Sequence, residues 1–231
     1  MANYANTVAY ICSYDEQALT KRHSKIKEAV NQNQASVKQF MENQGYSPDE
    51  IHELDRRDWI IYLDDEISHG GDYSYFELEL EQAWSPRLGW LYQLIRDQYG
   101  EGGFWVRWIG EESGCEIYVS NDEAGTFFTE KFIASGTTPE GCDFYEYLES
   151  KEGLVNMVND YYGTSFKSWE TTDKIQREIN AKAVKAQNMA GSTGWLSILE
   201  LEITHDYEDE YFGGEQCYDS LRARRVAWEL A

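Results

Sequence analysis

Segments in which hydrophobic and polar residues alternate predict the strands of this protein. The clearest is 73–82, where Phe76, Leu78 and Leu80 alternate with glutamates. Residues two apart on a strand lie on the same face, so this segment should have one buried and one solvated face. Similar patterns predict strands at 7–12, 58–67, 104–112, 115–122 and 194–203, and an edge strand at 126–133. The strands at 104–112 and 115–122 should form a hairpin.

Hydrophobic residues at helical spacing predict the helices. Between 15 and 32, Leu19, Ile26 and Val30 recur seven and four residues apart, which places them on one helix face. Ser85 followed by Pro86 is typical of the first turn of a helix. The helices predicted on these grounds are 15–32, 37–45, 48–55, 85–99, 153–163, 168–188 and 216–229.

The order of these elements predicts an α+β fold. A strand, a helix, two strands, a helix and a further strand follow one another in 1–165. This order is that of a ferredoxin-like antiparallel sheet with helices on one face. Residues 166–231 should then form an α/β C-terminal extension, a helix-strand-helix that packs on the same core.

A resemblance to a known family covers 76–122. The matching residues are Ala83, Trp84, Ser85, Pro86, Trp90, Leu91, Glu111, Glu112 and Gly114. They form an AWSP motif, a tryptophan and leucine in the next helix, and a Glu-Glu-x-Gly turn. This pattern resembles the YubB-like ferredoxin-like domains of phages and plasmids, although Arg87 stands where that family has a second proline. The resemblance implies a fold and a mobile-element context but no particular chemistry, and Trp84 and Trp90 are expected to anchor the core.

Composition predicts a folded protein of the host bacterial cytoplasm. The chain has 231 residues, 42% of them hydrophobic and 15% aromatic, which suffices for a sizeable core. Apolar runs are shorter than the roughly 18 residues that span a bilayer, and the first ten residues lack the layout of a signal peptide. We therefore expect no membrane contact. The cysteines, which should be reduced thiols, are Cys12, Cys115, Cys142 and Cys217.

The strongest signal is charge. There are 42 acidic and 20 basic residues, a formal net charge of -22, and 57–166 alone hold 22 acidic and 6 basic side chains. Such a surface repels phosphates, which disfavours direct binding to nucleic acid. Solubility alone is the simplest explanation of such an excess.

Catalytic and metal-binding motifs are missing from the sequence. It contains no GxSxG, Walker or GxGxxG pattern, and none of the four histidines has a cysteine or histidine three or four residues away. Asp64, Asp65, Glu77 and Glu79 resemble the carboxylates of a two-metal site, but no lysine is suitably placed. The segment 206–215 does not have the glycine and the final glutamate at the positions that a calcium loop requires. We expect a protein that is not an enzyme and has no cofactor.

The candidate partner-binding residues are rows of carboxylates beside tyrosines. Glu77, Glu79 and Glu81 should lie on one strand face about 6.6 Å apart, a spacing comparable to that of successive phosphates. A second row is predicted on 194–203. The full candidate set is Tyr73, Tyr75, Glu77, Glu79, Glu81, Asp64, Asp65, Glu111, Glu112, Glu200, Glu202, Asp206, Glu208 and Asp209. These rows are either a solvated sheet face or a surface that binds a basic protein.

Three functional hypotheses follow. The first is a phage inhibitor of a bacterial nucleic-acid-handling defence complex, such as a CRISPR effector, which mimics nucleic acid and binds a basic protein surface. The second is a binder or sponge for a small molecule such as a nucleotide, which would need Arg87, Arg96 or Arg107 to converge among aromatic rings. The third is a non-catalytic structural or regulatory subunit, with the basic helix at 168–188 docked on an acidic partner or a second copy. The sequence leaves the oligomeric state open.

Overall fold

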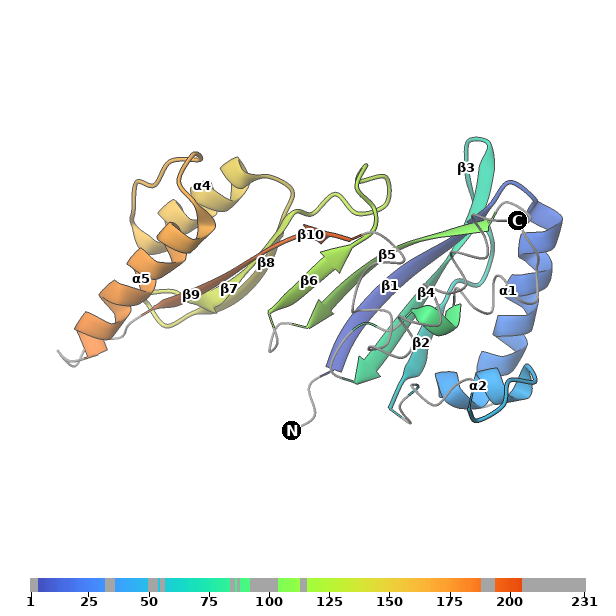
Figure 1. Ribbon diagram of the computed structural model, residues 1–231. Coiled ribbons are helices and arrows are strands. Elements are labelled where there is room, and N and C mark those ends of the chain that lie inside the picture. The colour runs from blue at the N-terminus through green and yellow to red at the C-terminus, as the bar shows by residue number, and fades with distance from the viewer. Residues whose placement is uncertain are drawn as a thin grey trace, which may run out of the picture. The chain divides into compact units, whose positions relative to one another are not determined.

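The computed structural model has a mixed α+β fold in two compact units (Figure 1). It describes residues 4–31, 36–49, 54, 57–83, 86, 88–91, 104–112, 116–187 and 194–204. The first unit comprises 1–123 and 203–231, and the second comprises 124–202. This division differs from the predicted one, which placed a boundary near residue 165.

The first unit contains a seven-stranded sheet. Its strands are β1 (Tyr4–Ser13), β2 (Trp59–Leu63), β3 (Ser68–Gly70), β4 (Tyr73–Ala83), β5 (Phe104–Glu112), β6 (Ile117–Ser120) and β10 (Glu202–Ile203). The strand order is β10-β6-β5-β1-β4-β2, with β3 paired to β4. The central strand β1 is antiparallel to both β4 and β5, so residues from three distant parts of the sequence lie side by side.

One face of this sheet packs against helices. Helix α1 (Glu16–Asn31) and helix α2 (Val37–Asn43) supply Leu19 and Phe40 to a core that also contains Phe76 from β4. The segment between β4 and β5 joins the same core through Trp90, which is buried as predicted. Trp84 lies outside the described residues. The remaining core residues are Ala9, Ile11, Ile26, Val37, Met41, Leu54, Ile60, Leu78, Leu80, Leu88, Leu91, Val106, Trp108 and Val119.

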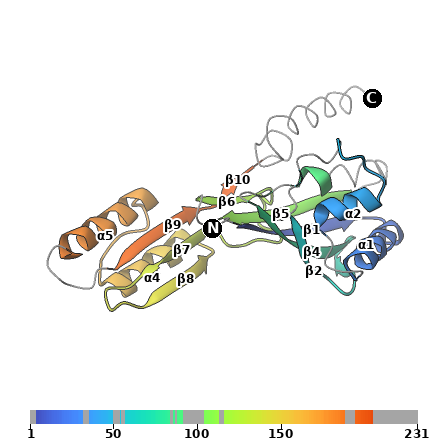
Figure 2. The same cartoon turned by 90° about the horizontal axis from the view of Figure 1, so that it is seen from below.

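The second unit is a three-stranded sheet with two helices (Figure 2). Its elements are β7 (Phe132–Thr137), β8 (Asp143–Leu148), α4 (Lys151–Tyr162), α5 (Thr172–Gln187) and β9 (Trp195–Glu200), and the strand order is β8-β7-β9. Leu154 of α4 and Ile175 of α5 meet Phe132 in a separate hydrophobic core. Helix α5 also contacts the edge strand directly, because the Asn180 amide donates to the Leu196 carbonyl at 2.8 Å and accepts from its N–H at 2.9 Å.

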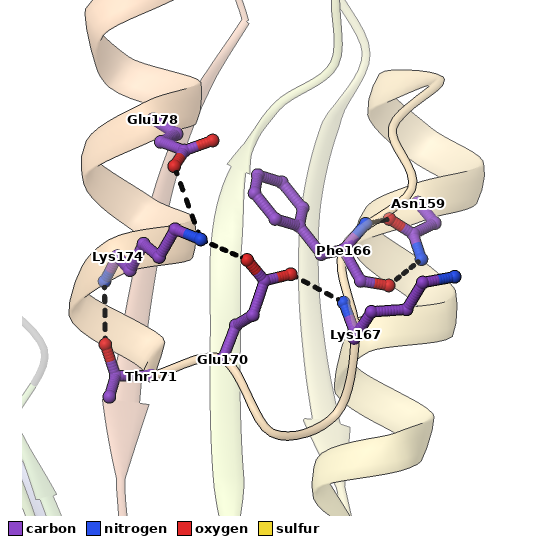
Figure 3. A network of polar contacts seen from close by, with 7 residues as sticks. All are labelled: Asn159, Phe166, Lys167, Glu170, Thr171, Lys174 and Glu178. Atoms are coloured by element: carbon purple, nitrogen blue, oxygen red, sulfur yellow. Dashed lines mark hydrogen bonds and ion pairs between the residues drawn. The ribbon is translucent and has the colours of Figure 1, made fainter.

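A polar network fixes the loop between α4 and α5 (Figure 3). The Asn159 side chain accepts from the Phe166 N–H at 2.8 Å and donates to its carbonyl at 3.0 Å. The Glu170 carboxylate accepts from the Lys167 N–H at 2.7 Å and forms an ion pair with Lys174. The start of α5 is therefore held by side chains on both sides of the loop.

Most predicted elements are confirmed, two differ and one strand was not predicted. The edge strand at 126–133 is wrong: β7 starts at Phe132 and lies in the centre of its sheet, and β8 was not predicted. The strand at 194–203 is two strands, β9 and β10, in different sheets. The helix at 216–229, most of 85–99 and most of 48–55 lie outside the described residues.

Candidate functional site

The sheet face of the first unit that points away from α1 and α2 carries the predicted glutamates. On β4, the buried residues Phe76, Leu78 and Leu80 alternate with half-buried glutamates, as the sequence predicts. We call the residues on this side of β1, β4 and β5 the acidic face. They are Tyr4, Asn6, Val8, Tyr10, Cys12, Tyr73, Tyr75, Glu77, Glu79, Glu81, Ala83, Trp105, Arg107, Ile109 and Glu111.

The strand register assembles this face. Tyr10 of β1 lies between Glu77 of β4 and Arg107 of β5. Two residues away, Cys12 lies in the same way between Tyr75 and Trp105. The acidic face therefore combines residues that are about 30 to 100 positions apart in the sequence.

Two carboxyl groups meet at the centre of the face. The Tyr10 hydroxyl donates to Glu77 Oε2 at 2.7 Å, and the Glu79 carboxyl hydrogen-bonds to Glu77. Desolvation, followed by the nearby charge of Glu77, raises the pKa of Glu79. In the part of the chain that the structure describes, no lysine or arginine forms an ion pair with either carboxyl group. The two carboxyl groups are thus closer together than successive phosphates, and no cation within the described ranges pairs with them.

Aromatic rings continue from this pair along the face. The ring centroids of Tyr10 and Tyr75 are 5.7 Å apart, those of Tyr75 and Tyr73 6.0 Å, those of Tyr73 and Trp105 5.5 Å, and those of Trp105 and Tyr14 4.7 Å. We call these residues the aromatic row. Burial and the adjacent Glu77 raise the pKa of Tyr10, so its phenol stays protonated at physiological pH. The row consequently offers uncharged rings beside two carboxyl groups.

Asp64 and Asp65, which both belong to the predicted partner-binding set, have separate roles. Asp64 Oδ2 accepts the backbone N–H of Glu77 at 2.8 Å and Oδ1 accepts the Tyr62 hydroxyl at 3.0 Å, so Asp64 joins the end of β2 to β4. Asp65 is 95% exposed and forms an ion pair with Lys27 of α1 at 2.9 Å, and Lys27 lowers its pKa. Asp64 belongs next to the carboxyl pair, whereas Asp65 contacts the helix.

Other predicted site residues are separated by the fold. Glu111 lies on the acidic face, opposite Asn6, but Glu112 is only 5% exposed because it points to the other face of β5. Glu200 pairs with β7 in the second unit, whereas Glu202 is in β10 of the first sheet. The second acidic row therefore does not form. Asp206, Glu208 and Asp209 lie outside the described residues.

Sequence reasoning missed Tyr10 and Trp105, two central residues of the face, and named Arg107 only for the nucleotide-binding hypothesis. The alternation in 104–112 indicates that Trp105 and Arg107 share a face, because they are two residues apart. It does not indicate which strands are neighbours. Only the pairing of β1 with both β4 and β5 brings these residues to the glutamates.

Within the described residues, no group of three or more histidine, cysteine, aspartate or glutamate side chains is arranged to hold a metal ion. None of the helices described is both long and apolar enough to span a bilayer. Comparison with protein-family models, curated proteins and solved structures finds no match to this chain.

Proposed function

We propose that this protein is a non-catalytic inhibitor whose acidic face binds a basic protein surface in a bacterial nucleic-acid-handling complex. The observation that carries the proposal is the pair Glu77 and Glu79, which are in contact, half-buried and without a cation among the described residues. A cationic partner would relieve the repulsion between them. The tyrosines beside them are the residue type that commonly anchors protein interfaces.

The distribution of charge supports this proposal. The second unit, 124–202, has 7 basic and 12 acidic residues, which leaves 13 basic and 30 acidic residues for the first unit. A strongly negative unit attracts basic surfaces at long range and accelerates their association. The same field opposes direct binding to DNA or RNA.

The inhibitory role and the bacterial target rest on the resemblance to YubB-like domains. We also propose that the first unit has a ferredoxin-like core. This proposal is supported by the antiparallel strand order β5-β1-β4-β2 and by the helices on one face of the sheet. A mobile-element protein with this surface would act against a defence complex such as a CRISPR effector. Because Glu77 and Glu79 touch, mimicry of nucleic acid would rest on charge and not on copied phosphate spacing.

Competition with DNA tests the proposal. A CRISPR effector-guide complex and a restriction endonuclease would each be titrated with labelled target DNA, and binding followed by fluorescence anisotropy at 50 and 150 mM salt. We expect the protein to displace DNA from at least one complex at both salt concentrations, and Glu77→Lys/Glu79→Lys to weaken displacement about tenfold or more.

A matched control separates a specific face from net charge. Glu140→Lys/Glu149→Lys changes the net charge equally at exposed positions of the second unit. We expect this variant to compete within threefold of the unaltered protein. Failure to displace DNA from either complex, or equal weakening by both double variants, contradicts the proposal. Circular dichroism would confirm that both variants are folded.

A further inference from the structure

We propose that Trp169 anchors a contact between the second unit and an acidic amphipathic segment of a partner protein. This contact goes beyond the proposed function, because it involves the locally basic part of the chain and not the acidic face of the first unit. It develops the hypothesis that the helix predicted at 168–188 docks on an acidic partner. The exposure of the ring, the fixed turn that carries it and the charges around it all support this contact.

Trp169 is the most exposed large hydrophobic side chain among the described residues. It is 81% exposed, although it follows Phe166, which is buried in the core of the second unit, by only three residues. A partner that covered the indole would remove roughly 200 Å² of mostly apolar surface from water. Tryptophan is also one of the residue types that most often dominate the binding energy of protein interfaces.

The turn that carries Trp169 is fixed from both of its ends (Figure 3). The Glu170 N–H donates to the Lys167 carbonyl at 3.0 Å, and the Glu170 carboxylate accepts from the Lys167 N–H at 2.7 Å. The same carboxylate forms an ion pair with Lys174 in the first turn of α5. A side chain on a fixed backbone loses less conformational freedom when it binds, so more of the energy from covering Trp169 becomes affinity.

The charge around the indole is opposite in sign to that of the whole protein. Lys167 is exposed in the same turn, and Arg177 and Lys182 are exposed on the solvent side of α5. Among the described residues, these three cations form no ion pair. Of the three carboxylates in this segment, two pair with Lys174, and Asp173 is the third. The amino-terminal end of α5, next to the turn, adds a partial positive charge.

An apolar anchor surrounded by positive charge is complementary to an apolar surface bordered by carboxylates. The positive charge continues along α5 to Lys182, roughly 15 Å beyond the first residue of the helix. An elongated partner is therefore favoured, such as an amphipathic helix with leucines on one face and glutamates beside them. The net charge of -22 disfavours an anionic membrane and nucleic acid, which the whole protein repels.

Two labelled amphipathic peptides test this inference. Both carry the same leucines at helical spacing, and one has glutamates where the other has lysines. Binding to the full chain would be measured by fluorescence anisotropy at 50 and 150 mM salt. We expect the glutamate peptide to bind, and Trp169→Ala to weaken its binding about tenfold or more. Trp195→Ala removes a tryptophan that is also exposed in the second unit, and should change the affinity by less than about twofold.

Two variants of Glu170 test the contribution of the fixed turn at equal net charge. Glu170→Gln keeps an oxygen that can accept from the Lys167 N–H, whereas Glu170→Ala removes it. We expect Glu170→Ala to bind the glutamate peptide about threefold more weakly than Glu170→Gln does. Equal affinities would overturn the presentation of Trp169 by a fixed turn.

The outcomes separate this inference from the proposed function. Binding of the glutamate peptide that survives Trp169→Ala, or no binding at either salt concentration, overturns the inference and leaves the acidic face unaffected. Loss of this binding in Glu77→Lys/Glu79→Lys also overturns it, whereas binding of the lysine peptide should depend on those glutamates and not on Trp169. Binding to phosphatidylserine vesicles or to single-stranded DNA that is lost in Trp169→Ala would assign the ring to lipid or nucleic acid and refute the inference. Circular dichroism would confirm that the variants are folded.

Discussion

Replacing Glu79 with glutamine should stabilise the first unit at neutral pH. The pKa of Glu79 is raised by desolvation and then by Glu77, so the folded protein binds this proton more tightly than the unfolded chain does. The contribution of this group to stability is therefore fully present below the pKa of the unfolded chain. It is lost as the pH rises through the folded pKa, and at pH 7 two adjacent charges repel one another.

The size of the effect follows from the geometry. Carboxyl groups in hydrogen-bond contact place their charges roughly 4 Å apart, which corresponds to about 1 kcal/mol of repulsion at the dielectric constant of water. Because the site is half-exposed and salt screens it, we expect Glu79→Gln to gain roughly 0.5–1 kcal/mol at pH 7. The glutamine amide can still donate to Glu77. The gain should shrink towards pH 4, where the glutamate is itself protonated.

Hydrogen exchange of β4 peptides measures this change locally, in the first unit. Protection should rise about twofold to fivefold at pH 7 in Glu79→Gln. Glu81→Gln removes the same charge from the same strand face, opposite Asn6, and should change protection by less than about twofold. Equal gains in both variants, or a gain that is independent of pH, would refute the account of a repelling pair.

Three further predictions concern other sites. Asn180→Ala should destabilise the second unit by roughly 2–3 kcal/mol in urea unfolding, because both backbone groups of Leu196 lose their partner. Asn180→Asp should destabilise it as well, because a carboxylate cannot donate to the Leu196 carbonyl. Gly136→Ala should prevent the second unit from folding, as judged by circular dichroism, because a methyl group would overlap the neighbouring strand. Burial raises the pKa of Cys12 to about 12, so at pH 8 iodoacetamide should modify the exposed Cys142 in the native protein and spare Cys12.

The sequence predicts local structure well because local structure depends on periodicity. The alternation around Leu78 and the helical spacing of Leu19 and Ile26 determine which side chains are buried, and these positions form the core of the first unit. The predicted secondary structure is wrong where a strand is interrupted within a segment of continuous alternation. Residues 194–203 alternate throughout, yet the strand ends at Glu200 and the chain enters a different sheet, which no local pattern indicates.

The site was predicted in part for the same reason. Glu77, Glu79 and Tyr75 were found because a single strand presents them together. Tyr10 and Trp105 come from other strands, and their distance from β4 depends on which strands pair and in which register. The contact between Glu77 and Glu79 was also beyond the sequence, because the strand repeat of about 6.6 Å describes backbone positions and not the ends of flexible side chains.

The position of the glutamates bears on whether the charge serves binding or solubility. A charge needed only for solubility costs least on fully exposed positions, as with Asp65, which is paired with Lys27. Glu77 and Glu79 are instead half-buried, in contact, and beside aromatic rings. Such an arrangement lowers stability, and sites that lower stability are retained where function requires them. If Glu79→Gln raises stability and at the same time weakens the displacement of DNA from the target complex, the two effects together identify the carboxyl pair as a functional feature; a gain in stability without a loss of displacement would assign it to the solvated surface.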